Sequence, residues 1–433
     1  MKQQRQNKWG IGLCIAAAVL VAAVLAVAWW LPSDAELAAR LRAEAEQRLG
    51  VIVTIDSAHW ALLPTPVVVV NDLRTQQEQP VVIGQLSAQP SVSALLQRKL
   101  AFKRIDLVDA VLPRNSIVGL TKPGAEAGSA PAAGDAVPVQ HFEFRNVTWI
   151  DYGGTAVAYD GEIDFDVNWR PRRAELRRPG ANPPFTLTLN RDGDADRWQT
   201  RILVGGGSAD GSVEFKARES GSVQLNGHLQ PHDIDVVSAL STFNRRSPIG
   251  GKASGQTVLS AEASSVGELA PSLHTRSLLH VSSARILRLD LDKAISTLGK
   301  EHEGQTALQE LTGQLDTQNS KEGMRVTYSN LKARHDKYTA RGEATIYHHH
   351  VEANGTLDLV DGAIGVPFSV SGPLDKPKAS VPPAFFAGTA VGTAVLPGIG
   401  TLIGARIGSS LGRIFKRGAT PPSAPTMGAT TKH

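Results

Sequence analysis

Three consecutive histidines, His348, His349 and His350, are the residues whose type best suits a metal ion. Imidazole nitrogens are common zinc ligands, and on a strand the first and third side chains share one face, about 7 Å apart. A zinc site needs further cysteine, histidine or carboxylate ligands at diagnostic spacings, and the sequence offers none. We therefore interpret the histidines as a solvated face of a strand.

An acidic run from Asp192 to Asp196 has the aspartate spacing of the start of a calcium-binding loop. The twelfth position of such a loop supplies a bidentate carboxylate, but here it is Leu203. We interpret the run as a hairpin turn. The glycines at 205 to 207 lack the lysine and helix of a phosphate-binding loop. The sequence therefore predicts no catalytic, cofactor-binding or metal-binding residues and no cofactor, so we expect the protein not to be an enzyme.

The composition limits the class of protein further. The chain has 433 residues, of which 42% are hydrophobic and 20% charged, so it can bury a core. Aromatic residues make up only 5%, whereas there are 41 glycines and 25 prolines, a balance that favours many short strands joined by turns. The net charge of +4 is small, and no stretch interleaves basic with aromatic residues, so we expect no nucleic-acid partner.

An uncharged apolar run from Gly10 to Leu31 follows a basic N-terminus. As a helix it is about 33 Å long, enough to cross a bilayer core of about 30 Å. Trp29 and Trp30 end it, where an aromatic belt lies in membrane proteins. We predict that residues 1–32 form a cytoplasmic tail and a single transmembrane anchor, and that the rest of the chain lies on the non-cytoplasmic side of the membrane. The alternative is a cleaved signal peptide, with a small-x-small site at Ala26 to Ala28.

The chain after the anchor divides by composition and pattern. A stalk helix is predicted from Ser33, which has the N-cap position of a capping box with Glu36, to about Leu49, where Gly50 ends it. The stalk helix and a first β region span 33–121. An Ala-, Gly- and Pro-rich linker spans 122–138, and a central and C-terminal β region spans 139–383.

Strict apolar–polar alternation marks the strands of this second β region, which puts one face of each strand in an apolar environment. Two folds fit: a pair of filled β-sandwiches, or an elongated, curled antiparallel sheet whose apolar face lines a groove. The few aromatic residues favour the groove, in a mainly β fold with a few short helices. The candidate lipid-groove residues are Phe165, Val213, Phe215, Val223 and Leu225.

A glycine-rich segment at 384–417 is the second membrane-like feature. Gly400, Gly404, Gly408 and Gly412 recur at every fourth position, which on a helix makes a smooth stripe for close packing. Pro397 divides the segment, so we predict a helical hairpin that is re-entrant, interfacial or self-associating and that contacts a second membrane or another copy. A flexible glycine-rich tail is the alternative. Residues 418–433 are predicted to be disordered.

Several blocks, in this order and spacing, resemble the AsmA family. They are Gly50 to Asp56 (GVIVTID) with Trp60, Pro64 and Pro66, Val67 to Arg74, Ser87 to Val111, Ala284 to Leu291 (ARILRLDL), Gly355 to Leu359 (GTLDL) and Val366 to Lys378 (VPFSVSGPLDKPK). The resemblance implies a bacterial inner-membrane protein with a cytoplasmic N-terminus and a periplasmic β-groove, similar to bridge-like lipid transfer proteins.

The expected function combines the anchor, the alternating strands and this resemblance. We expect a membrane-anchored envelope protein that binds or transfers phospholipid through an apolar β-groove and supports outer-membrane homeostasis. Its partners would be membrane lipids and the inner membrane. The rival hypothesis is a structural or assembly factor of the cell envelope that transports nothing.

Overall fold

The computed structural model describes residues 33–61, 65–97, 101–118, 138–151, 153–167, 170–193, 195–218, 222–263, 269–297, 301–320, 323–336, 338–359 and 366–380. The predicted anchor, nearly all of the linker and the glycine-rich hairpin with Gly400, Gly404, Gly408 and Gly412 lie outside these residues, as does the tail after it. None of the helices described is long and apolar enough to cross a bilayer. The chain divides into two compact units, Met1–Pro179 and Gly180–His433.

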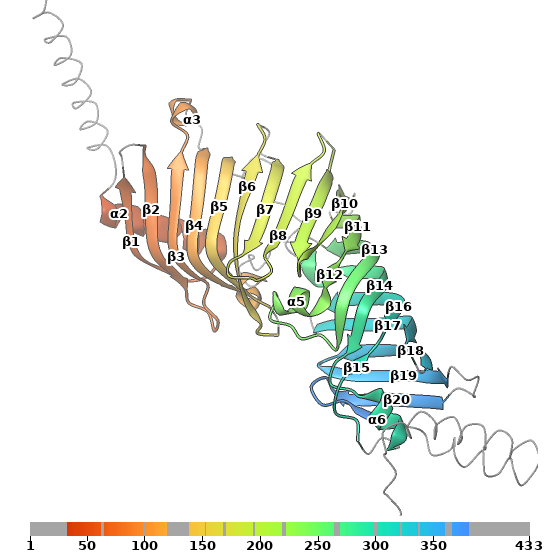
Figure 1. Cartoon of the computed structure of the whole chain (residues 1–433). Coiled ribbons are helices and arrows are strands. Elements are labelled where there is room, and N and C mark those ends of the chain that lie inside the picture. The colour runs from red at the N-terminus through yellow and green to blue at the C-terminus, as the bar shows by residue number, and fades with distance from the viewer. Residues whose placement is uncertain are drawn as a thin grey trace, which may run out of the picture. The chain divides into compact units, whose positions relative to one another are not determined.

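In the described residues, unit 1 is a sheet of seven strands with three helices (Figure 1). Its elements are α2 (Asp34–Leu49), β1 (Val53–Ala61), β2 (Val67–Thr75), β3 (Val82–Pro90), α3 (Val92–Leu96), β4 (Phe102–Pro113), α4 (Arg114–Val118), β5 (Val139–Ile150), β6 (Ala156–Phe165) and β7 (Pro171–Arg178). Each strand pairs with the next along the chain. All pairs are antiparallel except β4 with β5, which is parallel, contrary to the expectation of a wholly antiparallel sheet. Parallel neighbours need a crossover connection, which the chain between Pro113 and Val139 is long enough to make.

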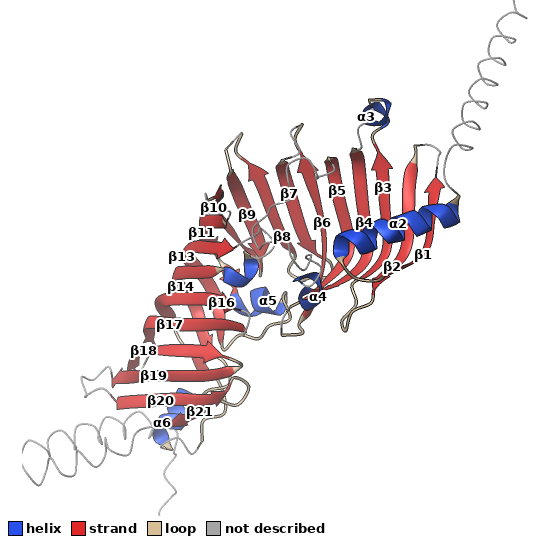
Figure 2. Cartoon of the chain, turned by 180° about the vertical axis from the view of Figure 1, so that it is seen from behind, coloured by secondary structure: helices blue, strands red, loops and turns tan. Residues whose placement is uncertain are grey.

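Helix α2 spans the residues predicted to be helical after the anchor. The Ser33 side chain accepts a hydrogen bond from the Glu36 amide at 3.3 Å, and Gly50 ends the helix in the left-handed conformation. Leu37 is buried against Val53 and Ile55 of β1, and Figure 2 shows α2 lying across one face of the sheet. The helix therefore covers apolar residues of the first strands.

An aligned row of left-handed residues changes the alternation of the unit 1 strands. Asp72, Asp109 and Asn146 on β2, β4 and β5 all have positive φ. Asp109 and Asn146 are neighbours, since the Asn146 amide nitrogen donates to the Asp109 carboxylate at 2.6 Å. On β2, Val70 and Leu73 flank Asp72 and pack in the same cluster although they are three residues apart. Period-two alternation therefore shifts by one residue at this row.

Unit 2 is a sheet of strands that follow one another in chain order (Figure 1). Its elements are β8 (Phe185–Arg191), β9 (Arg197–Val204), β10 (Gly207–Ala217), β11 (Val223–His232), β12 (Ile234–Asp235), α5 (Val236–Ser241), β13 (Ile249–Ala263), η2 (Ala270–Ser272), β14 (His274–Ile286), α6 (Leu291–Ser296), β15 (Thr306–Ala307), β16 (Glu310–Ser320), β17 (Gly323–Arg334), β18 (Tyr338–Tyr347), β19 (His350–Leu359), β20 (Val366–Pro373) and β21 (Lys378–Ser380). Its strand pairs are antiparallel, and the short strands β12 and β15 pair with the ends of β13 and β14. The predicted mainly β, open antiparallel architecture with few helices is thus observed.

Candidate functional site: an apolar sheet face and its cavity

One face of the unit 2 sheet is apolar from β13 to β19. A row of direct cross-strand partners crosses these strands, and all of it but Ala333 is buried. We call it the apolar row: Ala253, Val281, Leu311, Ala333, Ala340 and Leu357. The adjacent row is polar throughout: Lys252, Ser282, Glu310, Arg334, Thr339 and Asp358. Because successive side chains point to opposite faces, the apolar row and the polar row lie on opposite faces of the sheet.

Glycines lie beside the apolar row on the same face. Gly342 and Gly355 are direct partners on β18 and β19. A Cβ at Gly342 would lie 2.5 Å from the carbonyl oxygen of Asn354, and one at Gly355 would lie 2.6 Å from the Phe368 ring. These positions have no room for a side chain, so neighbouring apolar side chains lie directly over the backbone.

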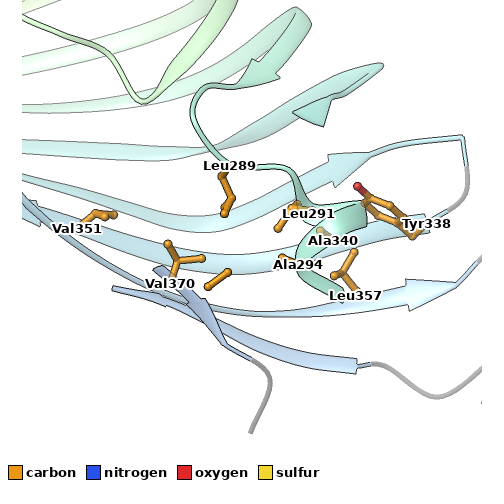
Figure 3. Packing of buried hydrophobic residues seen from close by; sticks show 9 residues of the cluster. Leu289, Leu291, Ala294, Tyr338, Ala340, Val351, Leu357 and Val370 are labelled. Atoms are coloured by element: carbon orange, nitrogen blue, oxygen red, sulfur yellow. The ribbon is translucent and has the colours of Figure 1, made fainter. Parts of the chain in front are cut away.

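A cavity of about 170 Å³ opens on this apolar face. Its floor consists of residues of β16 to β20, including Leu311, Tyr328, Ala344, Ala353 and Phe368, and the chain between β14 and α6 forms another wall. Figure 3 shows Leu289 and Leu291 of that wall above the strands that carry Ala340, Leu357 and Val370. Apolar cavities of about 150 Å³ stay dry and bind small apolar molecules, so this cavity suits hydrocarbon.

Tyr328 and Tyr338 are the titratable groups of this region whose pKa is shifted. Burial raises the pKa of the Tyr328 phenol, which lines the cavity, to about 12. Burial also raises the pKa of Tyr338, and the nearby carboxylates of Asp292 and Asp290 raise it further. Both phenols are therefore neutral at physiological pH, which leaves the site suited to binding an apolar ligand.

The candidate groove residues of unit 2 lie on this same apolar face. Phe215 is the direct partner of Leu225, and Val213 pairs with Gly227, which in turn pairs with Leu259 of β13. Leu259 is six residues from Ala253 in an unbroken register, so both side chains point to one face. Val223 pairs with Ala263 at the end of the same strand.

Val213, Phe215 and Leu225 pack in one cluster, and none of the four candidates lines the cavity. Val213 is buried with Trp198 and Leu259, and the Phe215 ring meets Trp198 edge-on at 6.4 Å between centroids. Phe165 belongs to unit 1. It lies on the same face of β6 as Ile163, which pairs with Phe142 of β5. The structure therefore brings four of the five candidates onto one face and leaves Phe165 in the other unit.

The cavity residues on β18 and β19 were missed from the sequence, although the signal was present. Ala340, Gly342, Ala344 and Ile346 alternate with Arg341, Glu343 and Thr345. Alanine and glycine have small side chains that bury little apolar surface, so the alternation of this strand is a weaker signal than that of strands with Val, Leu or Phe. Small residues are nevertheless the ones that leave space for a ligand on a sheet.

The histidine run is a turn and not the predicted strand face. Tyr347 pairs with His350, so His348 and His349 are the two loop residues of the β18–β19 hairpin, and both have positive φ. A two-residue hairpin of this type needs left-handed backbone at both loop positions, which ends the strand before them. All three histidines are exposed. Within the described residues, no group of three or more histidine, cysteine or acidic side chains could hold a metal ion.

The acidic run is the predicted hairpin turn. It joins β8 to β9, and the Asp192 amide donates to the Arg197 carbonyl at 2.9 Å.

The part of the chain that the structure describes is thus a mainly β protein whose open sheet has a cavity on its apolar face. A scan against protein-family models and searches of curated proteins and solved structures found no match.

Proposed function

We propose that this chain is a membrane-anchored protein of the cell envelope that binds or transfers phospholipid along the apolar face of unit 2. Acyl chains would lie on this face and enter the cavity between the strands and the chain leading to α6. The observation that carries the proposal is the cavity itself, whose lining is mainly aliphatic and aromatic and also includes Arg341, Glu343 and Asn354.

The energetics of such a site need no specific polar contact. Each methylene group removed from water contributes about 0.8 kcal/mol, so a few methylenes bind appreciably without any hydrogen bond. Pockets that enclose whole small molecules have volumes of about 300–1,000 Å³, and this cavity is smaller. It would therefore hold one stretch of an acyl chain while the rest of the lipid lies outside it.

The openness of the face favours ligand binding over a filled sandwich. Among the described residues, no second sheet covers the apolar face, and α6 with the chain before it packs over only part of it. Phe368 and Ile346 remain half-buried beside the cavity. Apolar side chains left partly accessible around a pocket are typical of ligand-binding sites.

The cellular placement rests on the sequence. The basic N-terminus and the uncharged run from Gly10 to Leu31 would anchor the chain in the bacterial inner membrane, with both β units in the periplasm. A protein held there meets phospholipid as the most abundant apolar ligand. Support of outer-membrane homeostasis would follow from moving that lipid.

The test is photo-crosslinking of the full chain in its native membrane. p-Benzoylphenylalanine is placed at Phe368, which lines the cavity, and in a matched control at Val258, which is 61% exposed on the opposite face. We expect phospholipid adducts by mass spectrometry at position 368 and few at 258. Protein adducts in place of lipid at 368 would overturn the proposal and favour the assembly-factor hypothesis.

A further inference from the structure

Two chain segments at the cavity each place one cation between residues that line it. Leu287 and Leu289 both line the cavity and flank Arg288, and Leu374 and Pro377 do the same around Lys376. Arg288 and Lys376 are exposed. Neither side chain forms an ion pair or hydrogen bond with another residue of the described part of the chain.

The backbone at Arg288 is unusual for a residue with a side chain. Its φ is +63°, in the left-handed region, where Cβ approaches the following carbonyl oxygen. Residues held in such conformations cluster at ligand-binding sites, where the surrounding structure fixes them. Here the chain next to Arg288 is fixed by Leu289, which is buried in the cluster over β18 to β20.

The charged residues that line the cavity itself are Glu343 and Arg341, and Arg341 lies 3.8 Å from Asp358. Neither Arg288 nor Lys376 forms an ion pair with an acidic group of the described residues. Asp290 accepts a hydrogen bond from the Lys293 amide at 3.0 Å and lies 3.9 Å from the Lys293 ammonium, so its charge is directed to α6. Asp375 is exposed beside Lys376, but no ion pair joins the two side chains. An apolar cavity with unpaired cations at its rim matches an amphiphile with a negative head.

We propose that the cavity selects anionic amphiphiles, with Arg288 and Lys376 binding the phosphate or carboxylate while the hydrocarbon chain enters between the strands. The guanidinium of Arg288 presents paired donors that match two oxygens of either group, and Lys376 adds a compact positive charge. This inference rests on the proposed function and names its ligand class.

The test measures headgroup preference at the cavity of the full chain in a non-ionic maltoside detergent. The chain carries p-benzoylphenylalanine at Phe368 and receives equal amounts of dioleoylphosphatidylglycerol and dioleoylphosphatidylcholine before irradiation. Because the choline ammonium offsets the phosphate charge of phosphatidylcholine, whereas phosphatidylglycerol is net negative, two unpaired cations should favour the latter. We expect about tenfold more adduct with the anionic lipid. The double variant Arg288→Gln/Lys376→Gln should bring the ratio close to one, with adducts still formed.

The control variant is Lys252→Gln/Arg285→Gln, which removes two exposed cations that do not line the cavity. It should keep the preference. A second experiment with oleate and oleyl alcohol distinguishes the two anions. If the chain selects oleate and this selection depends on Arg288, the site binds a carboxylate. If the chain prefers phosphatidylglycerol but does not select oleate, the site binds a phosphate.

Two results separate the possible failures. Equal adducts with both phospholipids in the unmodified chain, or a preference that survives Arg288→Gln/Lys376→Gln, would overturn the headgroup inference while leaving lipid binding in place. Absence of any lipid adduct at position 368 would overturn the proposed function itself.

Discussion

Ala344 of β18 and Ala353 of β19 are direct cross-strand partners, and both line the apolar cavity. Two methyl groups face each other where larger side chains would fill the space. We predict that Ala344→Trp fills the cavity and lowers the phospholipid retained by the purified full chain at least about fivefold, since it removes the space that each buried methylene needs. Lipid extraction and mass spectrometry measure the retained amount per mole of protein.

The control for this variant is Thr345→Trp, on the opposite face of the same strand and outside the cavity lining. It adds the same ring and should leave lipid retention unchanged. If thermal unfolding shows that the Ala344→Trp variant is folded, and it retains as much lipid as the unmodified chain, the ligand lies elsewhere.

A buried glycine of unit 1 should tolerate no side chain. A Cβ at Gly161 would lie 2.4 Å from the Phe144 ring and 2.6 Å from the Glu175 carbonyl oxygen. We predict that Gly161→Ala destabilises the protein by about 1–3 kcal/mol, the usual range for overpacking, in urea unfolding of the full chain. Gly153→Ala is the matched control, because its Cβ would meet only the Asp151 carboxylate at 3.4 Å, and it should change stability by less than about 0.5 kcal/mol.

The free edge of β1 is capped by α2. Glu46 accepts a hydrogen bond from the Val53 amide at 3.1 Å, and Arg42 donates to the Ile55 carbonyl at 3.4 Å. Open strand edges pair with other chains, so we predict that Arg42→Ala/Glu46→Ala increases self-association and costs about 1–2 kcal/mol of stability. Sedimentation velocity measures the first effect and urea unfolding the second.

A control for the edge variant is Glu44→Ala, which removes only an exposed ion pair with Arg48 on the same helix. Exposed pairs of this kind contribute about 0.3–0.5 kcal/mol. Equal self-association of the two variants would show that the caps on β1 do not protect the edge.

The pKa of Tyr328 predicts a loss of stability in alkali. It is about 12 in the folded chain, raised by burial, and about 10 in an unfolded chain. The folded state therefore keeps a proton that the unfolded state loses. Stability from this group is complete below pH 10 and falls as the pH rises from 10 to 12. Tyr328→Phe should make the decline over this window shallower, measured as urea midpoints at successive pH values; an unchanged slope would contradict the burial of the phenol.

The sequence alone determined the local elements. Ser33, Glu36 and Gly50 specify both ends of α2, because caps act on backbone groups within one turn. Alternation placed strands through unit 2 and put Val213, Phe215, Val223 and Leu225 on one face, since a period of two is a property of a single strand. The hairpin at Asp192 also followed from local residue types.

Only the tertiary structure decided how the strands combine. The left-handed residues at Asp72, Asp109 and Asn146 shift the apolar spacing from two to three residues, which no single strand reveals. The parallel pair β4–β5 and the cavity beside Ala344 and Ala353 depend on register between strands. Register is set by contacts between residues distant in sequence, so local pattern cannot supply it.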